Sequence, residues 1–291
     1  MGRGAGCHGS RVVGVRLIAV LLAAAPAVAR AQADIARMPA DSTHAAGAHA
    51  PGPLFSRRDA WIGLGFVAAT AAALPLDQRV AYNLQLPQNQ NEPGLVRASA
   101  VFRNIADPGT VYIGTGMYAA GLLFQNRTLA DMGLHASESL AIASVAGFVL
   151  KGIVGRPLPR QRNADADSYV FGRGMRVDGN WQAFPSGHTL AVFSIASAVT
   201  AEAQDRWPSH GTLVGVLTYG VASAAGISRL YNNAHWVSDV IFGAGIGIFS
   251  GIKTVQYAHT HPGNWVDRLL LHASLAPAPG GAVAAFHFEQ L

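Results

Sequence analysis

The chain has one cysteine, Cys7, among 291 residues, which excludes an intrachain disulfide and a cysteine-based zinc site. Charged residues are also few: Asp, Glu, Lys and Arg make up 13% of the sequence, against ~25% in soluble globular chains. Hydrophobic residues make up 50%, which excludes a disordered chain. The 33 glycines follow no G-X-Y period and so exclude collagen. We therefore expect closely packed helices, either in a dry bundle or in a membrane.

The formal net charge of +5 does not indicate a nucleic-acid partner. Four of the 21 basic residues lie in the first 31 positions, which contain no Asp or Glu: Arg3, Arg11, Arg16 and Arg30. The remaining 17 basic residues face 16 acidic ones, a net charge of +1. Because no basic tail is left, we do not expect nucleic-acid binding.

Residues 1–31 are typical of a secretory signal peptide. Arg11 and Arg16 precede a 13-residue apolar run at 17–29, and alanines at 29, 31 and 33 supply two cleavage sites of the small-x-small type. The run is short for a transmembrane helix, which needs ~20 residues, and an uncleaved anchor helix is the alternative. Residues 32–54 are rich in Ala, Pro, Gly and His and are expected to form a flexible linker. We therefore expect an exported protein of the periplasm or cell envelope.

The body of the chain, residues 55–260, is predicted to be all-α, a bundle of about six helices. Its apolar stretches lack the strict alternation of a half-buried strand, and most exceed strand length. They lie at Ala60–Leu76, Thr110–Phe124, Leu140–Leu150, Thr189–Ala201, Thr212–Ile227 and Val240–Ile252. In the tail, residues 261–291, two apolar arms flank Pro279-Gly280-Gly281, a pattern that predicts a short β-hairpin.

Whether the bundle spans a membrane is open from the sequence. The Ala and Gly content of the helices suits close packing in a membrane. However, the stretch at 140–150 lies between Glu138 and Lys151, and the stretch at 240–252 lies between Asp239 and Lys253. Charges at such short intervals also suit a compact exported bundle that is only associated with the membrane.

Three polar clusters interrupt the apolar chain. Consecutive helices joined by short loops run antiparallel, so the ends of the third and fifth helices share a pole with the starts of the fourth and sixth. The clusters lie at these four positions: 151–160 (KGIVGRPLPR), 184–189 (FPSGHT) and 228–239 (SRLYNNAHWVSD). We therefore expect all three at one pole of the bundle.

The contents of this pole suit a phosphate group. Lys151, Arg156 and Arg229 supply positive charge, and guanidinium groups match the geometry of phosphate oxygens. Ser186 and Gly187 open a helix, where free backbone N–H groups and the positive end of the helix dipole favour an anion. Ser186 is either the helix N-cap or a direct phosphate donor, and Gly187 allows a close approach of the backbone.

Two histidines and a carboxylate complete the predicted site. His235 and Asp239 are four residues apart, so on a helix the carboxylate could hold Nδ1–H and leave Nε2 free as a nucleophile. His188 is a second imidazole, suited to protonate a leaving oxygen. The same three residues could suggest a metal, but the surrounding cations would repel one. We therefore expect no metal at this pole.

These motifs resemble the signature of the type 2 phosphatidic acid phosphatase and vanadium haloperoxidase superfamily: K-x6-R-P, P-S-G-H and S-R-x5-H-x3-D. The resemblance covers about residues 55–260. It implies a helical bundle that hydrolyses phosphomonoesters or lipid (di)phosphates without a metal or other cofactor. By this resemblance His235 attacks phosphorus to form a phosphohistidine, Asp239 orients it, and His188 protonates the departing alcohol. The same resemblance implies which groups hold the phosphoryl oxygens: Lys151, Ser186, Gly187 and Arg229.

The first motif departs from this pattern. Leu158 stands where the spacing from Lys151 requires arginine, while an Arg-Pro pair occurs two positions earlier, at Arg156. Arg156 or Arg160 is the expected substitute donor, and a Leu158→Arg change is expected to do no harm. Two alternatives stay open: a vanadate-dependent haloperoxidase, which would hold vanadate in the same pocket, and a degenerate member without catalysis.

Overall fold

The computed structural model describes residues 53–176, 179–271, 273–278 and 281–286. The predicted signal peptide at 1–31 and nearly all of the predicted linker at 32–54 lie outside the described residues. In chain order the long helices are α2 (Arg57–Leu84), α5 (Thr110–Leu123), α6 (Arg127–Val154), α7 (Gly187–Arg206), α8 (Pro208–Tyr231) and α9 (Val237–Thr260). Shorter elements are α3 (Pro87–Gln90), α4 (Pro93–Asn104), η1 (Ile105–Gly109), η2 (Arg173–Met175) and α10 (Trp265–Leu270).

The all-α prediction is confirmed, and each of the six predicted stretches forms one of the long helices. The helices extend past the charges that border the apolar stretches. Glu138 and Lys151 lie inside α6, which has 28 residues, and Asp239 and Lys253 lie inside α9, which has 24. Both helices are therefore long enough to cross the ~30 Å hydrocarbon core of a bilayer.

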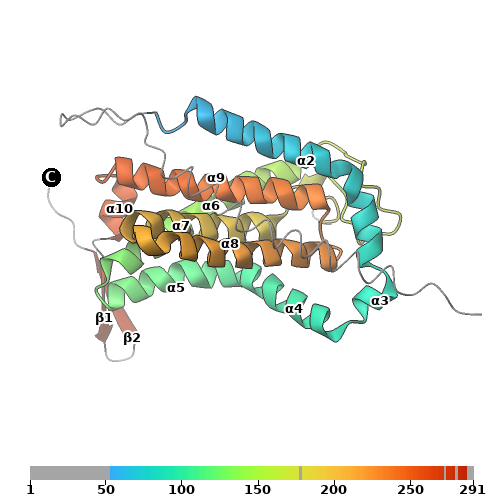
Figure 1. Ribbon diagram of the computed structural model, residues 1–291. Coiled ribbons are helices and arrows are strands. Elements are labelled where there is room, and N and C mark those ends of the chain that lie inside the picture. The colour runs from blue at the N-terminus through green and yellow to red at the C-terminus, as the bar shows by residue number, and fades with distance from the viewer. Residues whose placement is uncertain (1–52, 177–178, 272, 279–280, 287–291) are drawn as a thin grey trace, which may run out of the picture.

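Helix α7 forms the centre of the bundle, with α6, α8 and α9 packed around it (Figure 1). Most residues of α7 are buried, including Leu190, Phe193 and Ile195. The loop at 155–186 and α3 lie at one end of the bundle, and α10 lies at the other (Figure 1). Strands β1 (Ala273–Ala278) and β2 (Gly281–Phe286) pair antiparallel next to α5, which agrees with the predicted hairpin (Figure 1).

Glycines on α9 allow close packing against α7. A Cβ built on Gly243 would lie 2.7 Å from the carbonyl oxygen of Ser186, and one built on Gly247 would lie 2.4 Å from that of Leu190. One built on Gly251 would lie 2.7 Å from that of Ser194, so three glycines at four-residue spacing follow three carbonyls of α7 at the same spacing. The two helices therefore run parallel at close range, and both begin at the same pole.

The protein is embedded in a membrane. Helices α2, α6, α8 and α9 are each long and apolar enough to cross a bilayer. Their outward faces carry large apolar side chains, such as Val145 and Phe148 on α6 and Leu213 and Leu217 on α8. Phe148 is 77% exposed, a state that suits contact with lipid rather than with water.

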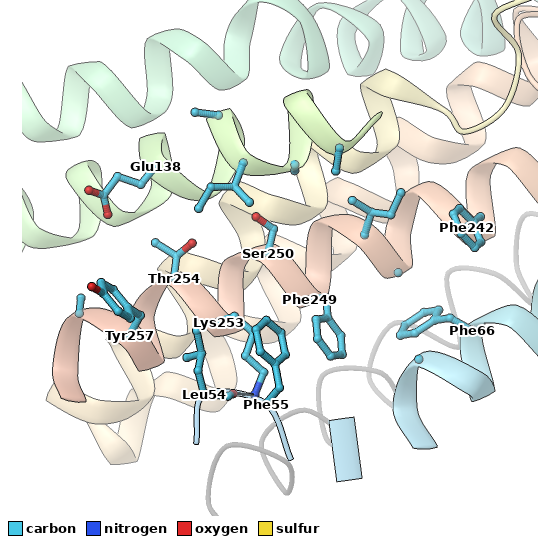
Figure 2. Close-up of a pocket in the computed structure, with 18 of the residues that line it drawn as sticks. Leu54, Phe55, Phe66, Glu138, Phe242, Phe249, Ser250, Lys253, Thr254 and Tyr257 are labelled. Atoms are coloured by element: carbon cyan, nitrogen blue, oxygen red, sulfur yellow. Dashed lines mark hydrogen bonds between the residues drawn. The ribbon is translucent and has the colours of Figure 1, made fainter. Parts of the chain in front are cut away.

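A cavity of about 880 Å³ lies between α2, α6 and α9 (Figure 2). Its walls are almost entirely apolar, with Phe66 and Phe242 at one end and Glu138, Thr254 and Tyr257 at the other (Figure 2). In the described part of the chain, none of the predicted site residues lines this cavity.

We predict that Gly247→Ala destabilises the bundle by about 1–3 kcal/mol, because the new methyl group would collide with backbone atoms of α7. Thermal unfolding of the purified protein in detergent measures the effect. Gly65→Ala on α2 is the matched control, because no described atom lies within 4 Å of its built Cβ. Equal melting temperatures for the two variants would contradict the close packing of α7 and α9.

Candidate functional site

The three polar clusters meet at one pole of the bundle. Lys151, in the last turn of α6, donates from Nζ to the carbonyl oxygens of Gln182 and Pro185, each at 2.6 Å. The backbone N–H of Ser186 donates to the carbonyl oxygen of Asp239 at 3.0 Å, which joins the starts of α7 and α9. The convergence predicted from the order of the helices is therefore present.

The loop at 155–186 connects α6 to α7 and covers this pole. Gly155 ends α6 in a left-handed conformation, with φ of +58°, and a Cβ there would lie 2.0 Å from the carbonyl oxygen of Val170. Only glycine fits this turn, which redirects the chain into the bundle. Arg156 then pairs with Gln182, next to the start of α7.

The His235 imidazole is buried, and its tautomer is set by one contact. Nδ1 lies 2.7 Å from the carbonyl oxygen of Ala183. Because a carbonyl can only accept, the neutral ring carries its proton on Nδ1 and leaves the Nε2 lone pair free. Burial, assisted by the charges of Lys151 and Arg229, lowers the pKa of His235 to about 4. The ring is therefore neutral and available as a nucleophile at physiological pH.

Asp239 differs from its predicted position. Helix α9 begins at Val237, so His235 precedes the helix and the two residues do not share a helical face. Oδ2 of Asp239 lies 3.8 Å from Nδ1 of His235, beyond hydrogen-bond distance, and instead accepts from the backbone N–H of Trp236 at 2.8 Å. The carbonyl oxygen of Ala183, and not Asp239, is the hydrogen-bond partner of Nδ1, and Asp239 caps α9.

The prediction that Arg156 binds phosphate is wrong. Its side chain is fully buried, and its five N–H groups make five hydrogen bonds to protein acceptors. Nη1 donates to Oδ1 of Asp239 at 2.5 Å, and Nη2 donates to Oδ2 of Asp77 at 2.6 Å. No donor is left for a ligand, so Arg156 holds Asp239 from behind the site.

Asp77 is a residue that sequence reasoning missed. It lies on α2, is fully buried, and accepts from the backbone N–H of Ser238 at 2.9 Å as well as from Arg156. The network of Asp77, Arg156 and Asp239 therefore fixes the first turn of α9 to α2 and to the loop. A lone acidic residue at the end of an apolar stretch was the only available signal.

Arg229 contrasts with Arg156. It lies in the last turn of α8 and is 6% exposed. Within the described residues, its Nε and Nη1 atoms are buried and have no hydrogen-bond acceptor. Its charge contributes to the lowered pKa values of both His188 and His235, so the guanidinium acts on the same pole as the two imidazoles. An anion at this position would satisfy donors that the protein leaves unpaired.

The start of α7 supplies further donors. Ser186 is the N-cap, because its Oγ accepts from the backbone N–H of Thr189 at 3.4 Å and bonds to Oγ1 of Thr189 at 2.8 Å. Among the described residues, the backbone N–H groups of Gly187 and His188 have no acceptor. A Cβ on Gly187 would lie 3.4 Å from Cε of Lys151, so this turn lies beside the lysine. The sequence left two roles open for Ser186, and the contacts favour capping.

His188 is half-buried at the start of α7. Burial, followed by the charges of Arg229, His235 and Lys151, lowers the pKa of His188 to about 3. Its Nε2 lies 3.8 Å from Oδ2 of Asp107, an exposed carboxylate on η1 that the sequence analysis did not identify.

Leu158 packs into an apolar cluster with Ala166, Ala183 and Trp236 and is 6% exposed. The expectation that Leu158→Arg does no harm is therefore incorrect, since the new charge would be buried in apolar surroundings. Arg160, the other suggested donor, is exposed at the same pole, and its charge acts on Arg229.

The structure thus shows a helical bundle with basic side chains gathered around a buried histidine at one pole. Residues 133–262 match the family model of the PAP2 superfamily. The transmembrane PAP2-type phosphatidylglycerolphosphate phosphatase from Bacillus subtilis has the same fold, with a TM-score of 0.52 and 18% identity. The match covers 70% of this chain and 97% of that structure.

Two relatives have assigned names. The chain is 44% identical over 132 residues to the lipid A 1-phosphatase of Porphyromonas gingivalis, a match that covers 45% of this chain and 25% of that protein. It therefore spans only a quarter of that relative. It is 24% identical over 196 residues to the undecaprenyl-diphosphatase of Sulfolobus acidocaldarius, covering 67% of this chain and 87% of that protein.

We predict that Arg156→Lys lowers stability by about 3 kcal/mol, because lysine has three donors and cannot bridge Asp77 and Asp239 as the planar guanidinium does. Thermal unfolding measures the loss, and the exposed Arg162→Lys is the control. If Arg156→Lys kept its stability and only weakened phosphate binding, Arg156 would contact the ligand after all.

Proposed function

We propose that this protein is a metal-independent phosphatase that hydrolyses a phosphomonoester or diphosphate carried by a lipid, through a phosphohistidine formed at His235. The observation that carries the proposal is the buried Arg229 guanidinium, whose Nε and Nη1 donors have no acceptor among the described residues and whose charge acts on His235. A buried donor without an acceptor costs about 1–3 kcal/mol. A phosphate group bound next to Arg229 would remove this cost and hold phosphorus close to Nε2.

The first step is attack by Nε2 of His235 on phosphorus. A nitrogen–phosphorus bond forms, the bond from phosphorus to the ester oxygen breaks, and His188 gives its proton to the departing oxygen. In the second step water attacks the phosphohistidine, His188 takes a proton from that water, and inorganic phosphate leaves. The Nδ1–H contact to Ala183 supports the tautomer that this sequence requires.

His188 must be protonated to act as an acid, although burial and the nearby cations lower its pKa. A bound phosphate dianion would offset the charges of Arg229 and Lys151 and raise the pKa of His188. The proton would then be available only while a substrate is bound.

Lys151, Arg229 and the backbone N–H groups of Gly187 and His188 are the proposed donors to the phosphoryl oxygens. Lys151 keeps one N–H after its two bonds to carbonyl oxygens. Ser186 caps α7, and Asp239 positions the segment that carries His235. In this proposal Arg156 has a supporting role only.

A lipid substrate is supported by two observations. The bundle is embedded in a membrane, so its pole lies at the level of lipid head groups. The similar proteins from Porphyromonas gingivalis and Sulfolobus acidocaldarius are named for reactions at lipid A and at undecaprenyl diphosphate.

We predict that His235→Ala lowers kcat by at least about 1,000-fold, because it removes the nucleophile. Release of phosphate from phosphatidate, undecaprenyl diphosphate and a chromogenic monoester is measured in detergent with EDTA present. His210→Ala, on an exposed histidine of α8, is the matched control. Full turnover by His235→Ala would refute the mechanism, and halogenation only after vanadate is added would indicate a haloperoxidase.

We predict that kcat/KM falls as the pH drops through about 4. Protonation of His235, whose pKa is lowered to about 4, removes the free Nε2, whereas an unperturbed histidine would titrate near 6.5. The pH profile of kcat/KM is measured with a monoester and with a diphosphate. A fall at the same pH for both substrates reports an ionisation of the enzyme and not of the substrate. A common acid limb near pH 6.5 would show that His235 is not held neutral by its surroundings.

A further inference from the structure

A second polar cluster lies at the opposite end of the bundle, beside α10. It combines His135 and Glu138 of α6 with Glu202 of α7, His259 of α9 and Asp267 of α10. Two overlapping sets of ligand atoms occur here, and within each set the atoms lie within 4.8 Å of one another. One set is His135, Glu202 and His259; the other is His135, Glu138 and Asp267.

In the first set, both carboxylate oxygens of Glu202 already have hydrogen-bond partners. Oε1 of Glu202 accepts from Nδ1 of His135 at 2.5 Å and lies 3.0 Å from Nε2 of His259. Oε2 of Glu202 accepts from Nε of Arg206 at 2.9 Å. Glu202 is fully buried, and its charge is already compensated by these partners.

The second set contains the unpaired atoms. His135 is 3% exposed, and within the part of the chain described here its Nε2 has no hydrogen-bond partner. The same holds for Oδ1 of Asp267, which lies 3.4 Å from that nitrogen. This distance is long for a hydrogen bond, whereas two ligands of a tetrahedral ion with ~2.1 Å bonds lie about 3.4 Å apart.

The surroundings match the outer shell of a metal site. A histidine that binds a metal through one nitrogen usually donates the other N–H to a carboxylate, as His135 does to Glu202. Oδ2 of Asp267 accepts from Nδ2 of Asn264 at 2.7 Å, which leaves Oδ1 facing His135.

The charge of this region also favours a cation. The ion pairs and ligand sets here join five carboxylates to two arginines: Asp131, Glu138, Glu202, Asp205 and Asp267 with Arg127 and Arg206. These carboxylates outnumber these arginines by three, and a divalent ion offsets two of the excess charges.

Glu138, the third residue of the second set, borders a cavity. Glu138 lines one end of the cavity between α2, α6 and α9, at the same end as Thr254 and Tyr257 (Figure 2). Oγ1 of Thr254 is a further buried atom with no partner among the described residues. There is therefore room at Glu138 for a water molecule that completes the coordination shell.

We propose that Nε2 of His135 and the carboxylates of Glu138 and Asp267 bind one divalent transition-metal ion, which fastens α10 to the bundle. One imidazole and two carboxylates suit Zn²⁺ or Mn²⁺. This site lies at the pole opposite His235 and is independent of the proposed hydrolysis.

The test uses the full chain in detergent, stripped with a chelator and then titrated separately with Zn²⁺ and Mn²⁺. We expect one equivalent of one of these ions per chain by elemental analysis, with a raised melting temperature. Glu138→Gln should weaken binding by about 100-fold or more, and Asp267→Asn should do the same. Asp205→Asn, on a side chain that is 66% exposed, is the matched control and should keep the ion.

Two results would overturn the proposal. One is the absence of bound ion at saturating Zn²⁺ and Mn²⁺, with nitrogen NMR reporting His135 protonated on both nitrogens and paired with Glu202 and Asp267. The other is an ion that survives Glu138→Gln but is lost in His259→Ala, which would assign it to the first set. Turnover of Glu138→Gln in EDTA tests the hydrolysis separately from metal content.

Discussion

The contact between Arg156 and the two carboxylates of Asp77 and Asp239 is the constraint on which the active pole depends. All three side chains are fully buried, so each charge needs the others in a place where water cannot compensate it. The contact joins α2, the loop after α6 and the first turn of α9. Because Asp239 also caps α9, the same contact sets where that helix starts and hence where His235 lies. A change in any of the three is expected to shift the position of His235 without removing its side chain.

The two buried arginines of this pole have opposite states. All N–H groups of the Arg156 guanidinium donate to protein acceptors, whereas Nε and Nη1 of Arg229 have no acceptor in the described part of the chain. A buried guanidinium whose donors all have acceptors stabilises the fold. One with unpaired donors lowers the stability of the fold unless an anion accepts from them. One pole therefore combines a guanidinium that is fully hydrogen-bonded, next to Asp239, with one that keeps free donors.

The sequence was sufficient to predict the long helices and the convergence of the three polar clusters at one pole. Apolar stretches of helical length determine the helices, and the short connections between them determine the convergence. The sequence was not sufficient for the direction of Arg156, since an Arg-Pro pair reads the same whether the side chain faces a ligand or a carboxylate. Asp77 was invisible for the same reason: its partners are 79 and 161 residues away in the chain. The spacing of His235 and Asp239 was misleading, because four residues suggest a shared helical face only if the helix begins before the first of them. The roles of these residues in catalysis remain predictions.

The parallel pairing of α7 and α9 has a consequence for where the two polar clusters meet their surroundings. Asp239 and His259 are separated by 20 residues of one continuous helix, which is ~30 Å at 1.5 Å per residue and equals the hydrocarbon thickness of a bilayer. The glycine contacts prevent α9 from sliding along α7, so this length is fixed. One cluster therefore faces one leaflet and the other faces the opposite leaflet. Solutes that reach His235 and ions that reach Asp267 would come from different aqueous compartments.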